Sequence, residues 1–292
     1  AQDDLIARST PGRGSYLDFL HPDGVDRSQA VVDQTFRERG SGPMHAILRI
    51  EGRYTYPGTG RPDSPFVTRI HAYAGSSSLR VLHSITYTGT PDQHEPPEGA
   101  YSLIATASDS VLIDESALGL DQGWTQPLDR INAAGLSLSL TGSPTGSLVG
   151  VREGDWWDAN APLVTREQQG AVSVVQSGPA VDRQTAPPSS SMDARIEGFP
   201  MILQDEVVPD ARWDGWVDVQ SDRFGLTVAY ANALESYPSG ITVSEDGQML
   251  LEIWPEASPA ASFNRYDTEP DAQMLGNFAT GFMHTTELAL SV

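Results

Sequence analysis

Residues 67–89 read VTRIHAYAGSSSLRVLHSITYTG, and this stretch decides the fold. Apolar and polar residues alternate on both sides of AGSSS, a run of small residues that is typical of a turn. A period of two is the period of a β-strand whose two faces have different surroundings. The stretch therefore predicts two antiparallel strands joined by a short connection.

The polar side of this predicted hairpin carries Arg69, His71 and Tyr73, and Arg80 follows just past the turn. An arginine side chain binds a carboxylate through two parallel hydrogen bonds, whereas histidine and tyrosine exchange protons near neutral or alkaline pH. The row is therefore a candidate site for an anionic ligand. The alternative is an ordinary solvated face with cross-strand ion pairs, each of which stabilises little.

The strand before this hairpin extends the same face. In MHAILRIEGRYTY, residues 44–56, Arg49, Glu51 and Arg53 share one parity. If the strands are antiparallel neighbours, Arg49 stands near Arg69 and His71. His83 has the opposite parity, with the apolar residues of its strand, and is predicted to be a hydrogen-bonded core histidine.

The period of two continues through most of the chain. The clearest stretches are residues 44–56, 66–74, 78–89, 101–113, 135–142, 170–178, 215–231, 240–255 and 280–292. Asp-Gly in SEDGQ, between two such stretches, is typical of a hairpin turn because both residues tolerate positive φ. Helical stretches are short, and the best candidates are residues 27–38 and 228–236. The pattern predicts an all-β fold, a large antiparallel β-sandwich with little helix.

Residues 179–193, PAVDRQTAPPSSSMD, lack any periodicity and are rich in proline and serine, which predicts a mobile loop. The strand-like stretches after this loop have the same character as those before it. We therefore expect residues 1–292 to form a single large β-sandwich domain, with two domains as the alternative.

The charge balance excludes several classes of function. The net charge is −21, and all 18 basic residues are arginines, because the chain contains no lysine. A nucleic-acid-binding protein needs a basic surface, which this composition does not predict. The sequence contains no run of about 18 apolar residues, so it predicts no membrane span. A Schiff-base lysine is excluded, so recognition of an anion has to use arginine, histidine or backbone N–H groups.

Two further stretches carry residue types that bind ligands. Trp156 and Trp157, in REGDWWDANAP, lie in a predicted loop, where an exposed indole can stack on a sugar ring. The alternative is that one of them closes the edge of the sandwich. The acidic residues in 203–218, LQDEVVPDARWDGWVD, lack the spacing of a calcium loop. We therefore expect no cofactor, with calcium as the alternative, and the six histidines lack the spacing of a zinc site.

Four motifs in this order resemble a known family. They are SGPMHAILRIEGRY, VTRIHAYAGSSSLRVLHSITYTG, GLTVAYANALESYPSGITVSEDGQMLLEIWPEA and TGFMHTTELALSV. Together they are similar to the central β-sandwich domain of the exo-rhamnogalacturonan-lyase/YetA-like family of polysaccharide lyases, over residues 40–90 and 213–292. The resemblance implies a super-sandwich of the galactose-mutarotase and lyase kind. It also implies an acidic polysaccharide of the rhamnogalacturonan or ulvan type as partner.

Lyases of this kind cleave a glycosidic bond beside a uronic acid by β-elimination. The resemblance implies arginines that neutralise the uronate, so that the neighbouring proton becomes more acidic, and a histidine or tyrosine that removes it. On this basis the candidate catalytic residues are His71, Tyr73 and His284. The candidate substrate-binding residues are Arg49, Arg69 and Arg80, with Trp156 and Trp157 added from the loop.

Three functions remain open from the sequence. The first is a polysaccharide-lyase-like sandwich that binds, and helps to cleave, uronic-acid-containing glycans. In such lyases a helical toroid forms the other wall of the cleft, and no stretch here predicts one, so independent activity stays open. The second is a non-catalytic carbohydrate-binding module, and the third is an exported assembly protein that self-associates. The chain opens with AQDD, a start typical of a cleaved signal peptide, so we expect a secreted protein.

Overall fold

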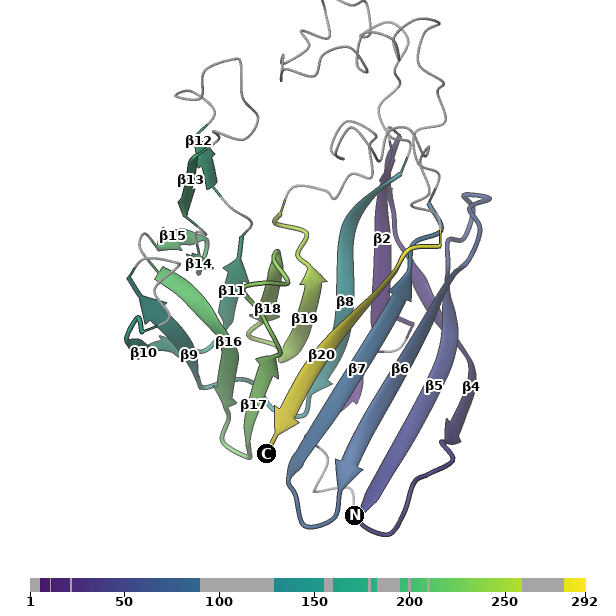
Figure 1. The fold of residues 1–292 in the computed structure, drawn as a ribbon, viewed down its shortest axis with the longest axis horizontal. Coiled ribbons are helices and arrows are strands. Elements are labelled where there is room, and N and C mark those ends of the chain that lie inside the picture. The colour runs from purple at the N-terminus through teal and green to yellow at the C-terminus, as the bar shows by residue number, and fades with distance from the viewer. Residues whose placement is uncertain are drawn as a thin grey trace, which may run out of the picture.

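The computed structural model describes most of the chain (Figure 1). The described residues are 6–10, 12–21, 23–89, 129–154, 160–177, 180–182, 195–198, 201–208, 211–258 and 281–292. Within these ranges the chain forms strands, turns and bends but no helix. None of the described residues therefore belongs to a helix of the length and apolar character that a membrane span requires.

The first sheet has nine strands among the described residues, in the order β15-β14-β11-β18-β19-β8-β2-β3, and β1 pairs with β8 beside this path. Its strands are β1 (Ala7–Ser9), β2 (Ser15–His21), β3 (Gly24–Asp26), β8 (Arg130–Leu140), β11 (Val172–Gln176), β14 (Met201–Leu203), β15 (Glu206–Val208), β18 (Ser239–Val243) and β19 (Gln248–Trp254). All of these pairs are antiparallel.

The second sheet also has nine strands in the described part of the chain, in the order β10-β9-β16-β17-β20-β7-β6-β5-β4. Its strands are β4 (Gln29–Arg37), β5 (His45–Thr55), β6 (Ser64–Tyr73), β7 (Ser78–Thr86), β9 (Gly146–Glu153), β10 (Leu163–Gln169), β16 (Ala211–Gln220), β17 (Gly225–Tyr230) and β20 (Met283–Ser291). A separate antiparallel pair is formed by β12 (Ala180–Asp182) and β13 (Arg195–Gly198).

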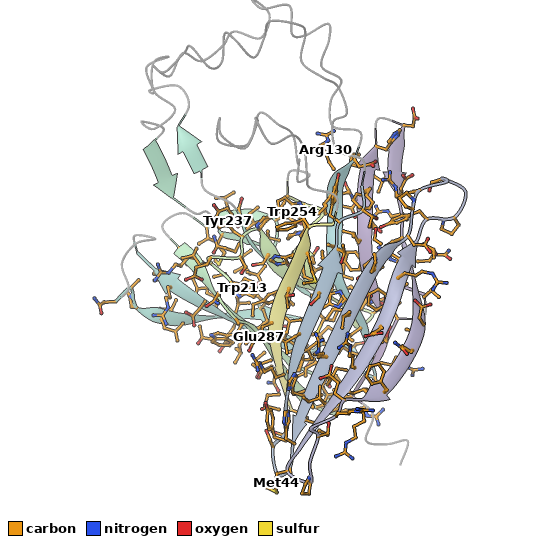
Figure 2. All side chains as sticks on the ribbon, turned by 45° about the vertical axis from the view of Figure 1, so that its right-hand side comes forward. Met44, Arg130, Trp213, Tyr237, Trp254 and Glu287 are labelled. Carbon is orange, nitrogen blue, oxygen red and sulfur yellow. The ribbon has the colours of Figure 1, made fainter. Side chains whose placement is uncertain are left out.

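The core lies between the two large sheets. One buried cluster joins Val149 and Trp213 of the second sheet to Ile241 and Leu251 of the first. A second buried cluster, around Phe19, joins residues of the two sheets at the β2 side of the sandwich. Figure 2 labels Trp213 in the region where the two sheets face each other. The large antiparallel β-sandwich predicted from the period of two is therefore confirmed.

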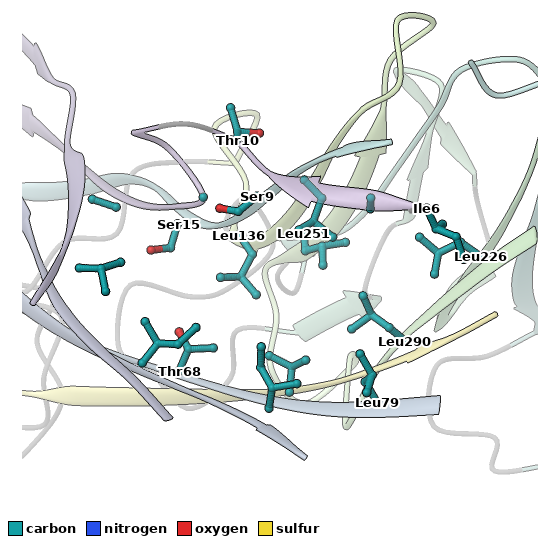
Figure 3. A pocket seen from close by; sticks show the side chains of 18 of the residues that line it. Ile6, Ser9, Thr10, Ser15, Thr68, Leu79, Leu136, Leu226, Leu251 and Leu290 are labelled. Atoms are coloured by element: carbon teal, nitrogen blue, oxygen red, sulfur yellow. The ribbon is translucent and has the colours of Figure 1, made fainter. Parts of the chain in front are cut away.

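An apolar cavity of about 630 Å³ also lies between the sheets. Figure 3 shows Leu136 and Leu251 on its first-sheet side and Leu79 and Leu290 on its second-sheet side. Packed protein cores hold few voids larger than a water molecule, so this cavity is a region where the two sheets are not fully interdigitated.

Neither of the two short helical candidates forms a helix. Residues 29–37 form β4, an edge strand that pairs with β5 over its whole length. Residues 228–230 end β17, and residues 231–236 form turns. Cross-strand hydrogen bonds to a long neighbouring strand outweigh the weak helical preference of such short segments.

Some sequence predictions lie outside the described residues. These include the strand predicted at 101–113. In the predicted mobile loop at 179–193, residues 180–182 form β12, and the remaining residues are outside the described ranges. The single-domain organisation stays a prediction.

Candidate functional site

Antiparallel register brings the predicted row of polar side chains together on the second sheet. Arg49 of β5 is directly opposite Arg69 of β6. His71 of β6 is opposite Arg80 of β7. Residues of the other parity, such as Thr68 and Val81, are buried toward the core. The row therefore lies on the face of the second sheet that points away from the first sheet, called the outer face below.

The arginines of the outer face are held by glutamates. Glu38 accepts a hydrogen bond from Arg69 Nε at 2.9 Å and another from Arg49 Nη1 at 3.2 Å. Arg49 also forms an ion pair with Glu51, with 2.5 Å between Nη2 and Oε1. The hydrogen bonds from Arg69 and Arg49 lower the pKa of Glu38, which keeps this carboxylate ionised.

Arg80 has a partner from the far end of the sequence. Its Nε and Nη2 donate to the two carboxylate oxygens of Glu287 in β20, at 2.6 and 2.7 Å. This bidentate pair lowers the pKa of Glu287 and raises that of Arg80. The side chains of both residues are more than a third exposed, so the pair is in contact with water.

An aromatic stack lies beside the ion pairs. The ring of His45 is parallel to that of Tyr73, with centroids 4.5 Å apart and an interplanar angle of 5°. The same ring is 5.2 Å from the ring of His71 at 20°. The 3.0 Å between His45 Nε2 and His71 Nδ1 is a hydrogen-bond distance. Tyr73 is 42% exposed, so its ring is available to a ligand.

The surroundings of His71 favour its neutral form. Its pKa is lowered first by burial and then by its neighbours His45 and Arg80. Its Nδ1 faces His45, and its Nε2 is buried without a hydrogen-bond partner in the described part of the chain. Neither imidazole nitrogen is therefore presented to solvent in this arrangement.

Sequence reasoning did not include His45 among the candidate site residues. The sequence does place His45 on the outer face, because His45 shares the parity of Arg49 within one strand. The structure then shows that the strand register puts His45 opposite Tyr73. Its role depends on stacking, and ring stacking cannot be read from parity alone.

The structure does not bring His284 to the outer face. His284 of β20 has the parity of the buried residues Thr286 and Leu288 and is opposite Ile85. Its Nε2 is 3.1 Å from Thr286 Oγ1, and burial lowers its pKa. His284 is thus on the core side of the sheet, away from His71.

His83 is also on the core side, and here the prediction is confirmed. It is fully buried, and its two ring nitrogens are hydrogen-bonded to Tyr54 Oη at 2.9 Å and Thr68 Oγ1 at 2.8 Å. Burial lowers its pKa to about 3.

Trp156 and Trp157 lie outside the described residues, so their ligand role stays a prediction. In the acidic stretch, Asp214 pairs with Arg152 at 2.5 Å, and Asp218 accepts a hydrogen bond from Thr227 at 2.8 Å. Within the described ranges no group of three or more histidine and acidic side chains is placed to hold a metal ion.

Comparison with solved structures finds similarities at low TM-scores and low identities. The alpha-galactosidase from Lactobacillus brevis has a TM-score of 0.42 and 8% identity over 94% of this chain and 28% of that one. The GH36 alpha-galactosidase AgaB from Geobacillus stearothermophilus has a TM-score of 0.41 and 9% identity over 94% of this chain and 29% of that one. A putative aldose 1-epimerase from Escherichia coli K12 has a TM-score of 0.30 and 13% identity over 91% of this chain and 68% of that one.

The chain spans less than a third of the length of these galactosidases. At such scores and identities the similarities say nothing about the chemistry of this chain. No curated protein matches the sequence.

A family model matches residues 25–95, with the description "PcRGLX-like protein central beta sandwich domain". The matched segment contains β4, β5, β6 and β7, and therefore every outer-face residue described above except Glu287. The motifs of residues 213–292 lie outside the match. The predicted resemblance is confirmed for residues 25–95, which are similar to the central β-sandwich domain of PcRGLX-like, rhamnogalacturonan-lyase-like proteins.

Proposed function

We propose that this chain is a secreted glycan-binding β-sandwich of a polysaccharide-lyase-like protein, and that its ligand is a uronic-acid-containing glycan of the rhamnogalacturonan or ulvan type. The observation that carries the proposal is the stack of His45, His71 and Tyr73 beside Arg80, inside the segment that matches the family model. The exposed Tyr73 in this group is an aromatic contact next to Arg80, a carboxylate-binding group.

The apolar C–H side and the carboxylate of a uronic acid unit each have a suitable partner on the outer face. The C–H side of a pyranose ring is apolar and packs against the exposed ring of Tyr73. The uronate carboxylate replaces Glu287 as the bidentate partner of Arg80. Because an exposed ion pair contributes only about 0–1 kcal/mol, exchanging one carboxylate for another costs little.

A polymer that carries several uronates can bind more tightly than a single sugar unit, because it can make several contacts at once. The outer face offers Arg80, Arg69 and Arg49 in successive strands, so neighbouring uronates of one chain can engage more than one arginine. Linked contacts of this kind raise the overall affinity without any single strong contact. We therefore expect tighter binding to polymers than to single uronic acids.

The geometry supports binding better than independent β-elimination. A catalytic base has to reach the proton that it removes. His71 has one nitrogen facing His45 and the other buried, and His284 is on the opposite face of the sheet. Cleavage by this chain alone would require rearrangement of the stack, or a second wall that completes the site.

Affinity electrophoresis in gels containing rhamnogalacturonan, ulvan or polygalacturonate tests the proposal. We expect retardation of the wild type by at least one of these polymers. Tyr73→Ala should weaken the binding about three- to tenfold, because an aromatic contact contributes roughly 0.5–1.5 kcal/mol, whereas Tyr73→Phe keeps the ring and the binding. Leu163→Ala, which removes an exposed side chain of β10, is the matched control and should bind like the wild type.

Unchanged retardation of Tyr73→Ala would exclude the outer face as the binding surface. Absence of retardation of the wild type by all three polymers would contradict the proposal as a whole. The ultraviolet absorbance of the unsaturated uronate product, followed in the same mixtures, decides between binding alone and cleavage.

A further inference from the structure

The apolar cavity between the two sheets extends from the core to the surface. Figure 3 shows Leu136 and Leu251 of the first sheet on the side of the cavity opposite Leu79 of the second. Leu79 and Val292 both line the cavity and are 40% and 58% exposed. They lie at the same end of the sheet, because the Val292 N–H donates to the carbonyl oxygen of Ser77. The cavity therefore opens to water beside Leu79 and Val292, which are called the mouth below.

The cavity is long enough for an extended hydrocarbon chain. Its lining follows β6 from Phe66 to Ile70, and Leu79 at the mouth is opposite Ala72 in the β6–β7 register. At about 3.3 Å per residue, the path along β6 from Phe66 to the mouth is roughly 20 Å long. One leaflet of the hydrocarbon core of a bilayer, which lipid acyl chains fill, is about 15 Å thick. The cavity volume of about 630 Å³ is also within the range of ligand sites, roughly 300–1,000 Å³.

The lining of the cavity favours an apolar ligand over water. Among the described residues that line it, none has a charged side chain, and most are aliphatic. Two of its hydroxyl groups already have partners, because Thr68 Oγ1 is 2.8 Å from His83 Nδ1 and Thr10 Oγ1 is 2.9 Å from Ser137 Oγ. A buried water needs two to four polar partners, whereas apolar cavities of about 150 Å³ stay dry and bind small apolar molecules.

The size and the charge of the protein narrow the class of ligand. The cost of an empty cavity rises with its volume, because the atoms around it lose their packing contacts. A hydrocarbon chain restores these contacts along the whole lining. The net charge of −21 repels an anionic headgroup, so the part of the ligand that stays outside the mouth is expected to be uncharged.

We propose that this cavity binds the acyl chain of a neutral lipid, with the chain between the two sheets and the headgroup in water at the mouth. The cavity lies on the core side of the second sheet, so it uses none of the outer-face residues. The inference therefore goes beyond the proposed glycan binding and is tested separately from it.

The test is isothermal titration calorimetry with the octyl, decyl and dodecyl ethers of tetraethylene glycol, each below its critical micelle concentration. These probes share an uncharged headgroup that contains no sugar. We expect one ligand per chain and an affinity that rises about tenfold with each two added methylenes, because each methylene that enters the cavity leaves water. No binding of the dodecyl ether, or an affinity that does not depend on chain length, overturns the assignment.

Two variants locate the bound chain. Leu79→Asp puts a charge at the mouth, and Val81→Phe fills part of the cavity, so each should weaken binding of the dodecyl ether at least tenfold. Leu163→Asp is the matched control, because Leu163 is a 50% exposed leucine of β10 that does not line the cavity, and it should bind like the wild type. Equal affinities of Leu79→Asp and Leu163→Asp for the dodecyl ether overturn the assignment even where Val81→Phe does not fold.

Light scattering without a probe distinguishes a lipid from a second copy of the chain at the mouth. We expect the wild type to be a monomer, and a dimer that Leu79→Asp dissociates would overturn the lipid assignment. Leu79→Asp should be retarded by polyuronate like the wild type, because the outer face is unchanged. Ether binding without polyuronate retardation supports the cavity site and contradicts the proposed function, and the reverse result overturns the cavity site alone.

Discussion

In the folded protein, burial favours the neutral form of the His83 imidazole over the protonated, positively charged form. The core around it lowers its pKa to about 3, whereas an unfolded histidine has a pKa of about 6.5. Below the unfolded value the unfolded state therefore binds more protons than the folded state. Stability is then lost as the pH falls from about 6.5 toward about 3.

We predict that this loss can be isolated with His83→Gln. Between about pH 7.5 and about pH 5, the free energy of unfolding of the wild type should fall by on the order of 2 kcal/mol more than that of the variant. His71 and His284 titrate in the same direction, but they are present in both proteins and cancel in the comparison. Urea unfolding at the two pH values measures the difference, and equal pH dependence in both proteins would show that His83 is not the group responsible.

At the scale of single residues, parity predicted which side chains share a face. It placed Arg49, Arg69, His71 and Arg80 together and His83 on the core side, as the structure has them. Parity did not predict their partners. Glu287 is 207 positions from Arg80 in the sequence, and its pairing follows from β20 lying next to β7, which no local pattern encodes.

At the scale of elements, strands that alternate over a long stretch were predicted well, whereas the interior strands β2 and β9 and the edge strands β4 and β10 were not among the predicted stretches. β5, β6, β7 and β20 were recognised because each has one buried and one solvated face. β4 was not recognised because it is an edge strand that is exposed along most of its length, so burial does not impose an alternating pattern on it.

The pairing of β4 with β5 gives a prediction of its own. A Cβ at Gly52 of β5 would clash with the carbonyl oxygen of Val31 and lie 2.5 Å from Phe66 Cζ. Gly52→Ala should therefore destabilise the protein by about 1–3 kcal/mol. Gly42→Ala is the control, because a Cβ there meets nothing within 4 Å. Thermal unfolding of both variants checks this, and equal melting temperatures would refute the close approach at Gly52.

At the scale of the whole molecule, the two-layer sandwich followed from the period of two, but the order of strands in each sheet did not. The cavity between the sheets was not predictable either, because it depends on how side chains from β1, β8 and β19 meet those from β6, β7 and β20. Such gaps are a property of the assembled layers and not of any strand.

The cavity leads to a paired prediction. Val81 lines it, so Val81→Ile adds a methylene to open space and should stabilise the protein by up to about 1 kcal/mol. Val149 is fully buried in the core but does not line the cavity, so Val149→Ile should destabilise by about 1–3 kcal/mol. Denaturant unfolding compares the two, and destabilisation by both changes would mean that the sheets are closely packed at Val81.

The outer face is tested most directly by the imidazole resonances of the histidines during titration with a uronic-acid oligosaccharide. If the ligand stacks on Tyr73 and pairs with Arg80, the side-chain nitrogen and proton signals of His45 and His71 should move with saturation. Those of the buried His83 and of His21, on the first sheet, should stay in place. Binding detected by calorimetry without movement of the His45 and His71 signals would contradict the account.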